Sequence, residues 1–236
     1  IMSSDWSSDV CSSDLAHPFT TWQPTPGMMF IDNVQVQLID TPPLNDEFMK
    51  PELLQLIRQV DMMLIVVDLQ AFPIEQLEHA LALLESHRIA PEAYRDRYAD
   101  RQEPMTFVPA LVLVNKDDDA STDEDFQVLE ELVDADLPML PISAETGRHV
   151  DAFKAEIYER LGIVRIYAKP PGKEPDYSAP FVMYKGGTVE DFAVQVHRDL
   201  IETLKSARVW GEGVFDGQTV GRDHVLHDGD VVELRT

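Results

Sequence analysis

The segment Ala110–Asn115 is an apolar run that ends abruptly in charged residues, Lys116 and the aspartates after it. A short continuous run this rich in β-branched residues is typical of a strand buried on both faces. Such strands belong to parallel sheets covered by helices, and the loops after their carboxyl ends present groups to ligands. The segment therefore predicts a buried strand whose C-terminal loop can bind a polar ligand.

Segments with strand and helix patterns alternate along the chain up to residue 161. Strands are expected at 28–31, 34–40, 62–68, 110–115 and 140–143. Helices are expected at 46–60 with Asn45 or Asp46 as cap, at 73–88, at 122–135 with Thr122 as cap, and at 148–161 with Gly162 as C-cap. Residues 90–105 are expected as a charged surface insertion. This alternation predicts βαβ units and a mostly parallel sheet with flanking helices, an α/β fold.

A second, smaller domain is expected after residue 162. Residues 163–169 and 181–184 are predicted strands on either side of a proline-rich connection, and a helix at 189–204 precedes several short strands. One helix over a small mixed sheet is a β-grasp arrangement, whose core we expect to include Trp210 and Phe215. The domain boundaries are thus 16–162 and 163–236.

Residues 1–15 repeat the triplet Ser-Ser-Asp and follow no helical or strand period. They lack the apolar core and basic start of a secretory signal. The repeat is typical of translated sequencing-adapter sequence joined to a truncated gene, so we expect an artefactual or disordered leader. It contains Cys11, the only cysteine, so no internal disulfide is expected and a cytoplasmic location is favoured.

The net charge of −24 is unevenly distributed. Residues 163–236 hold 9 basic and 12 acidic residues, whereas the rest of the chain holds 10 and 31. An acidic surface repels phosphate backbones, so we expect no DNA binding and place any RNA contact in the C-terminal domain. No apolar run approaches the roughly 18 to 20 residues of a membrane span, so no membrane partner is expected.

The loop Asn115-Lys-Asp-Asp118 has side chains that suit recognition of guanine. The Asp118 carboxylate can accept hydrogen bonds from guanine N1–H and the 2-amino group, which adenine cannot supply in that arrangement. The Asn115 amide can hold the loop and reach the purine edge, and the stem of Lys116 can cover the base. After the next strand, Ser143-Ala144 can offer a backbone N–H to guanine O6. The alternative is a strand that runs into a charged turn, and among the acids at 117–125 only Asp118 is expected to need a ligand.

Asp40 ends a predicted strand before two prolines, where phosphate-binding folds hold an aspartate near Mg²⁺, usually through a water. Thr20 or Thr21 could supply a hydroxyl ligand to the same ion. The alternatives are that Asp40 belongs to a turn and that the threonines are capping or strand residues.

The order of these motifs resembles the Obg-related GTPases. The resemblance rests on His17-Pro-Phe-Thr-Thr21, Gly27, Asp40-Thr-Pro-Pro43, Asn115-Lys-Asp-Asp118 and Ser143-Ala-Glu-Thr-Gly147. The C-terminal part is similar to the TGS domain of the developmentally regulated GTP-binding branch, through Thr188-Val-Glu-Asp-Phe192, His197, Ala207–Gly211 and Val220–Leu234. The resemblance implies a P-loop-type G domain, incomplete at its N-terminus, that uses GTP or GDP and Mg²⁺ as a switch. It also implies a role in translation or at ribosomes, with the TGS domain as a docking module.

Three features depart from that family. The sequence contains no Gly-x-x-x-x-Gly-Lys-Ser/Thr phosphate loop, which we expect to have preceded Ala16 in the full protein. Pro43 stands where the family has a glycine whose N–H reaches the γ-phosphate, and proline has no N–H. Leu44 stands where Ras-like enzymes have a water-orienting glutamine, although the Obg-related group also has an apolar residue there. We expect little or no turnover from this chain.

Two functions follow from the sequence. The first is a GTP-binding and hydrolysing switch, represented by a fragment without its phosphate loop. The second is a non-catalytic binding protein, in which the TGS domain docks a protein or RNA partner and the G domain serves as a scaffold.

Overall fold

The structure, a computed structural model, describes residues 24–133 and 136–236. The chain divides into two compact units, each described here by itself. Of the described residues, the first comprises 24–29 and 37–155 without 134–135, and the second comprises 30–36 and 156–236. The leader at 1–15 lies outside the described residues.

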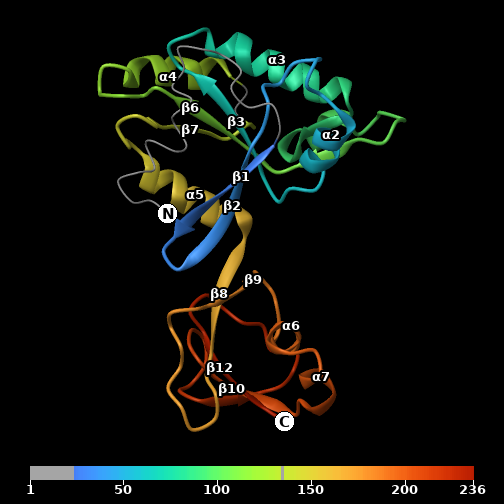
Figure 1. Cartoon of the computed structure of the whole chain (residues 1–236), viewed down its shortest axis with the longest axis vertical. Coiled ribbons are helices and arrows are strands. Elements are labelled where there is room, and N and C mark those ends of the chain that lie inside the picture. Colours follow the sequence, from blue (N-terminus) through green and yellow to red (C-terminus); the bar gives the residue numbers. More distant parts are fainter. Residues whose placement is uncertain (1–23, 134–135) are drawn as a thin grey trace. The chain divides into compact units, whose positions relative to one another are not determined.

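A three-stranded parallel sheet is the centre of the first unit (Figure 1). Its strand order is β3 (Met63–Asp68), β6 (Ala110–Asn115) and β7 (Met139–Pro141). The central strand β6 is buried from Ala110 to Val114, as its apolar sequence predicts. The sheet and the helices pack together in one apolar core, which includes Leu53, Leu77, Leu84 and Leu129. The predicted parallel α/β sheet is confirmed.

Among the described residues, the helices of this part of the chain are α2 (Pro51–Ile57), α3 (Pro73–Ser86), α4 (Asp123–Leu132) and α5 (Val150–Leu161). Gly162 ends α5 with a φ of +59°, as expected for a C-cap. Strands β1 (Thr25–Ile31) and β2 (Val34–Asp40) pair with each other through the turn at Asp32-Asn33.

The predicted start of the helix expected at 46–60 was wrong. Helix α2 begins at Pro51 rather than near residue 46, because Asn45 caps a local turn: its side chain and carbonyl both accept the Phe48 N–H. The charged insertion expected at 90–105 is mostly exposed and has secondary structure of its own. It contains β4 (Ile89–Pro91), the 3₁₀ helix η1 (Glu92–Tyr98) and β5 (Thr106–Val108), with β4 and β5 paired in parallel and Tyr94 buried.

The second unit has a five-stranded mixed sheet in the order β11-β10-β12-β8-β9. Its strands are β8 (Ile163–Ala168), β9 (Phe181–Tyr184), β10 (Ser206–Trp210), β11 (Gln218–Val220) and β12 (Val231–Arg235). Strands β8 and β12 are parallel, whereas β9, β10 and β11 pair antiparallel with their neighbours. Phe192 and Ile166 are fully buried in its core. The predicted β-grasp arrangement is confirmed.

The helix expected at 189–204 is broken into α6 (Val189–Val196) and α7 (Leu200–Thr203), because His197 has extended backbone. A capping box starts α6, in which Thr188 and Asp191 exchange backbone-to-side-chain hydrogen bonds. Phe215 was predicted to pack in the core, but its side chain is 85% exposed, whereas Trp210 is half-buried. Among the described residues, no helix combines the length and the apolar character that crossing a membrane requires.

Gly211 should tolerate no side chain. A Cβ there would lie 1.7 Å from Oδ1 of Asp230, a buried carboxylate whose Oδ2 accepts the His227 N–H at 2.8 Å. We expect Gly211→Ala to lower the free energy of unfolding by about 2 kcal/mol, measured by chemical denaturation. Gly27→Ala is the matched control, because its Cβ would meet nothing closer than 3.9 Å. Equal losses in both variants would contradict this prediction.

Asp228 should make the second unit sensitive to acid. Burial alone would raise the pKa of Asp228, but hydrogen bonds from Arg165 and Tyr158 lower it to about 2. A carboxylate with a lowered pKa contributes stability that is fully present above its unfolded pKa of about 3.9 and is lost as the pH falls through 2. We expect Asp228→Asn to be less stable than the parent at pH 6 and to lose less stability between pH 4 and pH 2, followed by thermal unfolding. Parallel pH curves for the two proteins would disprove the assignment.

Candidate nucleotide-binding site

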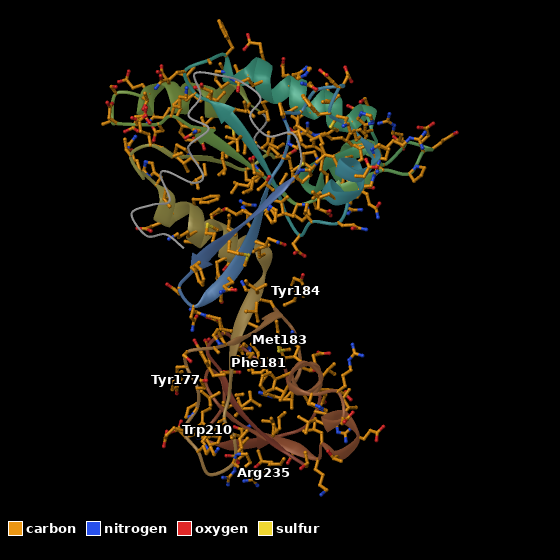
Figure 2. The ribbon with its side chains drawn as sticks, viewed as in Figure 1. Tyr177, Phe181, Met183, Tyr184, Trp210 and Arg235 are labelled. Atoms are coloured by element: carbon orange, nitrogen blue, oxygen red, sulfur yellow. The ribbon has the colours of Figure 1, made fainter. Side chains whose placement is uncertain are left out.

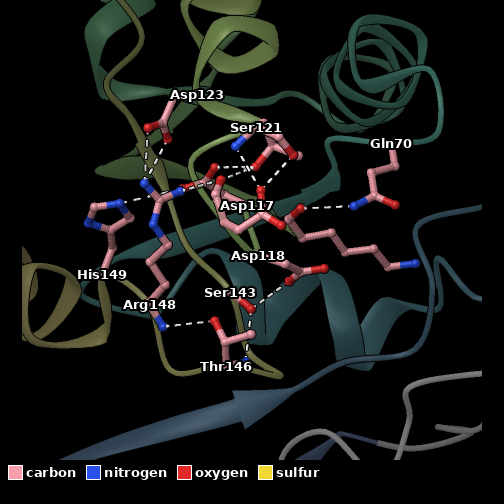
Figure 3. A network of polar contacts seen from close by, with 12 residues as sticks. Gln70, Asp117, Asp118, Ser121, Asp123, Ser143, Thr146, Arg148 and His149 are labelled. Carbon is pink, nitrogen blue, oxygen red and sulfur yellow. Dashed lines mark hydrogen bonds and ion pairs between the residues drawn. The ribbon is translucent and has the colours of Figure 1, made fainter.

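The register of the parallel sheet places the candidate residues at one edge. Asp68 is directly opposite Asn115 at the ends of β3 and β6, and Val114 is opposite Pro141 of β7. The loop after β6 and the loop after β7 therefore leave the sheet side by side (Figure 3). Two further bonds join them, because the Ile142 N–H donates to the carbonyl of Val114 and the Asp117 N–H donates to the carbonyl of Ile142.

Four of the predicted base-binding residues make direct contacts between these loops. Ser143 Oγ donates to Asp118 Oδ1 at 2.6 Å, and the Ala144 N–H donates to Asn115 Oδ1 at 3.0 Å. Ser143 is fully buried, and its Oγ also accepts the Thr146 N–H at 3.0 Å. The Asp118 carboxylate is thereby fixed in one orientation. Because the Ala144 amide already bonds Asn115, contact with guanine O6 through this amide requires that the bond be shared or exchanged.

Lys116 has a left-handed backbone with a φ of +70°. Its ammonium lies 2.9 Å from Asp68 Oδ2, and its carbonyl accepts the Gln70 Nε2–H at 3.1 Å. Because the side chain remains 43% exposed, its aliphatic stem is accessible while its charge is held at the end of β3.

The alternative, in which the acids at 117–125 belong to a charged turn, does not describe Asp117. This residue is fully buried, and its Oδ2 lies 2.7 Å from the Arg148 guanidinium. Thr122, the predicted helix cap, makes no capping bond to α4 and instead donates to Asp117 Oδ1 at 2.7 Å. A signal for this pair existed in the sequence, because Arg148 is the only Arg or Lys between Lys116 and Lys154.

Two ionisable groups around this loop have shifted pKa values. Hydrogen bonds from the hydroxyl and the N–H of Ser121 lower the pKa of Asp119. The hydrogen bond to Asp123 raises the pKa of Arg148, with a further contribution from the charge of Asp117. Both groups are therefore held in their charged forms.

The predicted Mg²⁺ ligands are described only in part. Asp40 ends β2 with an exposed carboxylate, a type of oxygen ligand that suits Mg²⁺, whereas Thr20 and Thr21 lie outside the described residues. Within residues 24–133 and 136–236, no three His, Cys, Asp or Glu side chains form a group that could hold a metal ion. Leu44, which stands where Ras-like enzymes have a water-orienting glutamine, packs against the apolar core of the first unit.

Ser143→Ala should destabilise the junction between the two loops. It removes the donor to Asp118 and the acceptor of the Thr146 N–H, and a buried bond to a charged group contributes about 2 kcal/mol. We expect a loss of that size in the free energy of unfolding, measured by urea denaturation. Ser121→Ala is the control, because that serine is exposed and bonds only Asp119 in the same loop. A Ser143→Ala protein as stable as the control would mean that this junction contributes nothing.

Two family models match the chain. A model described as 50S ribosome-binding GTPase matches residues 15–116, and the model of the TGS domain matches residues 164–236.

Curated relatives match over about half of this chain. An uncharacterized GTP-binding protein of Methanocaldococcus jannaschii is 37% identical over 129 residues, which are 54% of this chain and 33% of that protein. Developmentally-regulated GTP-binding protein 1 of Xenopus laevis is 37% identical over 130 residues, 54% of this chain and 34% of that protein. Ribosome-interacting GTPase 1 of Saccharomyces cerevisiae is 35% identical over 130 residues, with the same coverage. The aligned part of this chain spans about a third of the length of these relatives.

Solved structures share the fold. A GTP-binding protein from Pyrococcus horikoshii superposes with a TM-score of 0.56 at 15% identity, covering 91% of this chain and 88% of that chain. The YchF GTPase of Schizosaccharomyces pombe gives a TM-score of 0.56 at 14% identity, covering 79% and 75%. The chain therefore combines a segment similar to the 50S ribosome-binding GTPases, at residues 15–116, with a C-terminal part similar to the TGS domain, at residues 164–236.

Proposed function

We propose that the first unit binds guanine nucleotides through Asn115, Lys116, Asp118, Ser143 and Ala144. The observation that carries this proposal is the 2.6 Å bond from Ser143 to Asp118, formed between two loops at the carboxyl edge of a parallel sheet. That bond leaves Asp118 Oδ2 and further lone pairs of the carboxylate to accept the N1–H and 2-amino groups of guanine. Adenine has no donors in that arrangement, so the site would be selective for guanine.

We further propose that Asp40, with Thr20 or Thr21, attends a Mg²⁺ ion that neutralises phosphate charge. The exposed carboxylate at the end of β2 supports the first of these assignments. We also propose a domain boundary at Gly162, with residues 16–162 as the G domain and 163–236 as the TGS domain. The C-cap conformation of Gly162 supports this boundary.

For the whole protein we propose a cytoplasmic GTP-hydrolysing switch that acts with ribosomes through its TGS domain. The name of the yeast relative, Ribosome-interacting GTPase 1, supports the partner. The TGS unit also carries exposed aromatic side chains, including Tyr177 at 59%, Tyr184 at 62% and Phe215 at 85%, the first two labelled in Figure 2. Large exposed apolar groups are typical of interaction surfaces. The single cysteine favours a reducing compartment.

The alternative, a scaffold whose TGS domain docks a partner without nucleotide control, is favoured by Pro43. Proline offers no N–H to a γ-phosphate. Under this alternative, GDP and a non-hydrolysable GTP analogue would bind equally well. A switch requires different affinities of its two conformations for the two nucleotides.

The test of the proposed function is a titration of the 236-residue chain with GDP, a non-hydrolysable GTP analogue and ADP, by NMR saturation transfer or equilibrium dialysis. These methods detect weak binding, which we expect because the sequence has no phosphate loop and contact is directed at the base. The expected result is binding of the guanine nucleotides at concentrations where ADP does not bind. Equal binding of GDP and ADP to a folded chain would overturn the proposal.

Asp118→Asn should transfer selectivity from guanine to xanthine. The amide of asparagine donates where the carboxylate accepts, and xanthine has a carbonyl oxygen in place of the 2-amino group. We expect GDP binding to fall by on the order of 100-fold and xanthosine diphosphate binding to rise. Asp119→Asn is the matched control, because the carboxylate of that exposed residue accepts its hydrogen bonds from Ser121 in its own loop. Loss of both nucleotides in a folded Asp118→Asn chain would assign Asp118 a structural role instead.

A further inference from the structure

Arg148 joins the two loops of the candidate base site. It follows Gly147 in the loop between β7 and α5, and its guanidinium reaches across to the loop after β6 (Figure 3). Nη1 lies 2.7 Å from Asp117 Oδ2 and 2.9 Å from the carbonyl oxygen of Asp119, and Nη2 lies 2.8 Å from Asp123 Oδ1. One side chain thus bonds three residues of the opposite loop, including both neighbours of Asp118.

Because Asp117 is buried, its carboxylate requires a charged partner, and Arg148 provides it. The side chain of Asp117 is only 1% exposed, and a carboxylate buried without a partner is costly. Its Oδ1 is bonded by Thr122, and His149 Nε2 lies 3.5 Å from its Oδ2. Among the described side chains around this carboxylate, the permanently charged cation is Arg148. The fold of the loop at 117–123 therefore depends on where Arg148 lies.

The backbone of Arg148 holds the other half of the site. Its carbonyl accepts the Ser143 N–H at 3.0 Å, and the Ser143 carbonyl accepts the Gly147 N–H at 3.0 Å. Ser143 in turn fixes the Asp118 carboxylate. Arg148 therefore contacts both loops: its main chain bonds Ser143, and its side chain bonds Asp117. Asp118 follows Asp117 in the chain and is bonded by Ser143, so Arg148 positions it from both directions.

We propose that Arg148 is a positioning residue that locks the two loops together and so sets the selectivity of the site for the 2-amino group of a guanine base. This inference rests on the proposed function. Recognition of both N1–H and the 2-amino group requires both donors to meet well-placed carboxylate lone pairs, and a shift of about 1 Å is enough to lose one bond. A ligand without the 2-amino group makes only one of these bonds and is much less sensitive to such a shift.

The first experiment is amide hydrogen exchange on the nucleotide-free chain. In Arg148→Met we expect exchange to become at least roughly tenfold faster at residues 116–122 and 143–149, with no change in β3 and β6, because the loops open locally without unfolding the core. Arg101→Met is the matched control, since Arg101 makes an exposed ion pair with Glu85 at 3.1 Å in the same unit. Unchanged exchange in the two loops of Arg148→Met would overturn the proposal.

The second experiment compares GDP with inosine diphosphate, which lacks the 2-amino group. In the parent chain we expect GDP to bind more tightly, and in Arg148→Met we expect the ratio of the two affinities to fall several-fold. Arg148→Lys keeps the charge but not the three-way fork, so it should restore the ratio only in part. A merely structural arginine would lower the thermal stability and leave the ratio unchanged, which would overturn the proposal.

Failure of Arg148→Met to fold and lack of guanine selectivity in the parent chain are distinguishable outcomes. If Arg148→Met fails to fold because Asp117 is left unpaired, Asp117→Leu/Arg148→Met removes both charges at once, and the same faster loop exchange and lower ratio are expected from it. If the parent chain binds GDP and ADP equally, the proposed function fails and the selectivity role of Arg148 falls with it. The exchange experiment then still shows whether Arg148 couples the loops, so the two failures are distinguishable.

Discussion

The parallel pairing of β6 with β3 and β7 is the constraint on which the first unit depends. Because β6 lies between two strands and is buried on both faces, its side chains from Ala110 to Val114 are apolar, and polar residues begin where the strand ends. The register places the ends of all three strands at the same edge. The groups that we propose to bind the nucleotide therefore gather there as a consequence of how the core is built, before any contact between them forms.

A buried ion pair is weak evidence for stability, since apolar residues of similar volume often replace such pairs without loss. The ion pair of Asp117 and Arg148 contributes mainly by fixing how the two loops are oriented relative to each other. An apolar contact tolerates sliding, whereas a guanidinium with bonds at 2.7, 2.8 and 2.9 Å fixes both the distance and the angle between two loops. Loops that carry a recognition site need this kind of constraint more than they need additional free energy of folding.

The parts of the fold that follow from local pattern could be predicted from the sequence. The strand at 110–115, the C-cap at Gly162 and the β-grasp order each depend on periodicity or on one glycine. The proposed site residues Asn115, Asp118 and Ser143 follow from motif chemistry, and the structure brings them together. The errors share another origin. Asn45 was expected to cap a helix but closes a turn. Thr122 directly precedes α4 as expected, but its side chain bonds the buried Asp117 and does not cap the helix. In each case a tertiary or competing local hydrogen bond decided the outcome, and such partners cannot be identified from sequence spacing alone.

Two of the five described non-glycine residues with positive φ lie in the same loops. Lys116 and His149 both have positive φ, +70° and +61°, a conformation that costs a residue with a side chain roughly 1 to 2 kcal/mol. At Lys116 the left-handed turn interrupts the alternation of the strand, so that Asp117 is buried while Asp118 reaches Ser143. Asp68 and Gln70 hold Lys116 in this conformation through its ammonium and its carbonyl. Glycine at position 116 would relieve the strain, but it would also remove the ammonium that Asp68 binds. The ion pair with Asp68 therefore offsets the backbone strain of a lysine at this position.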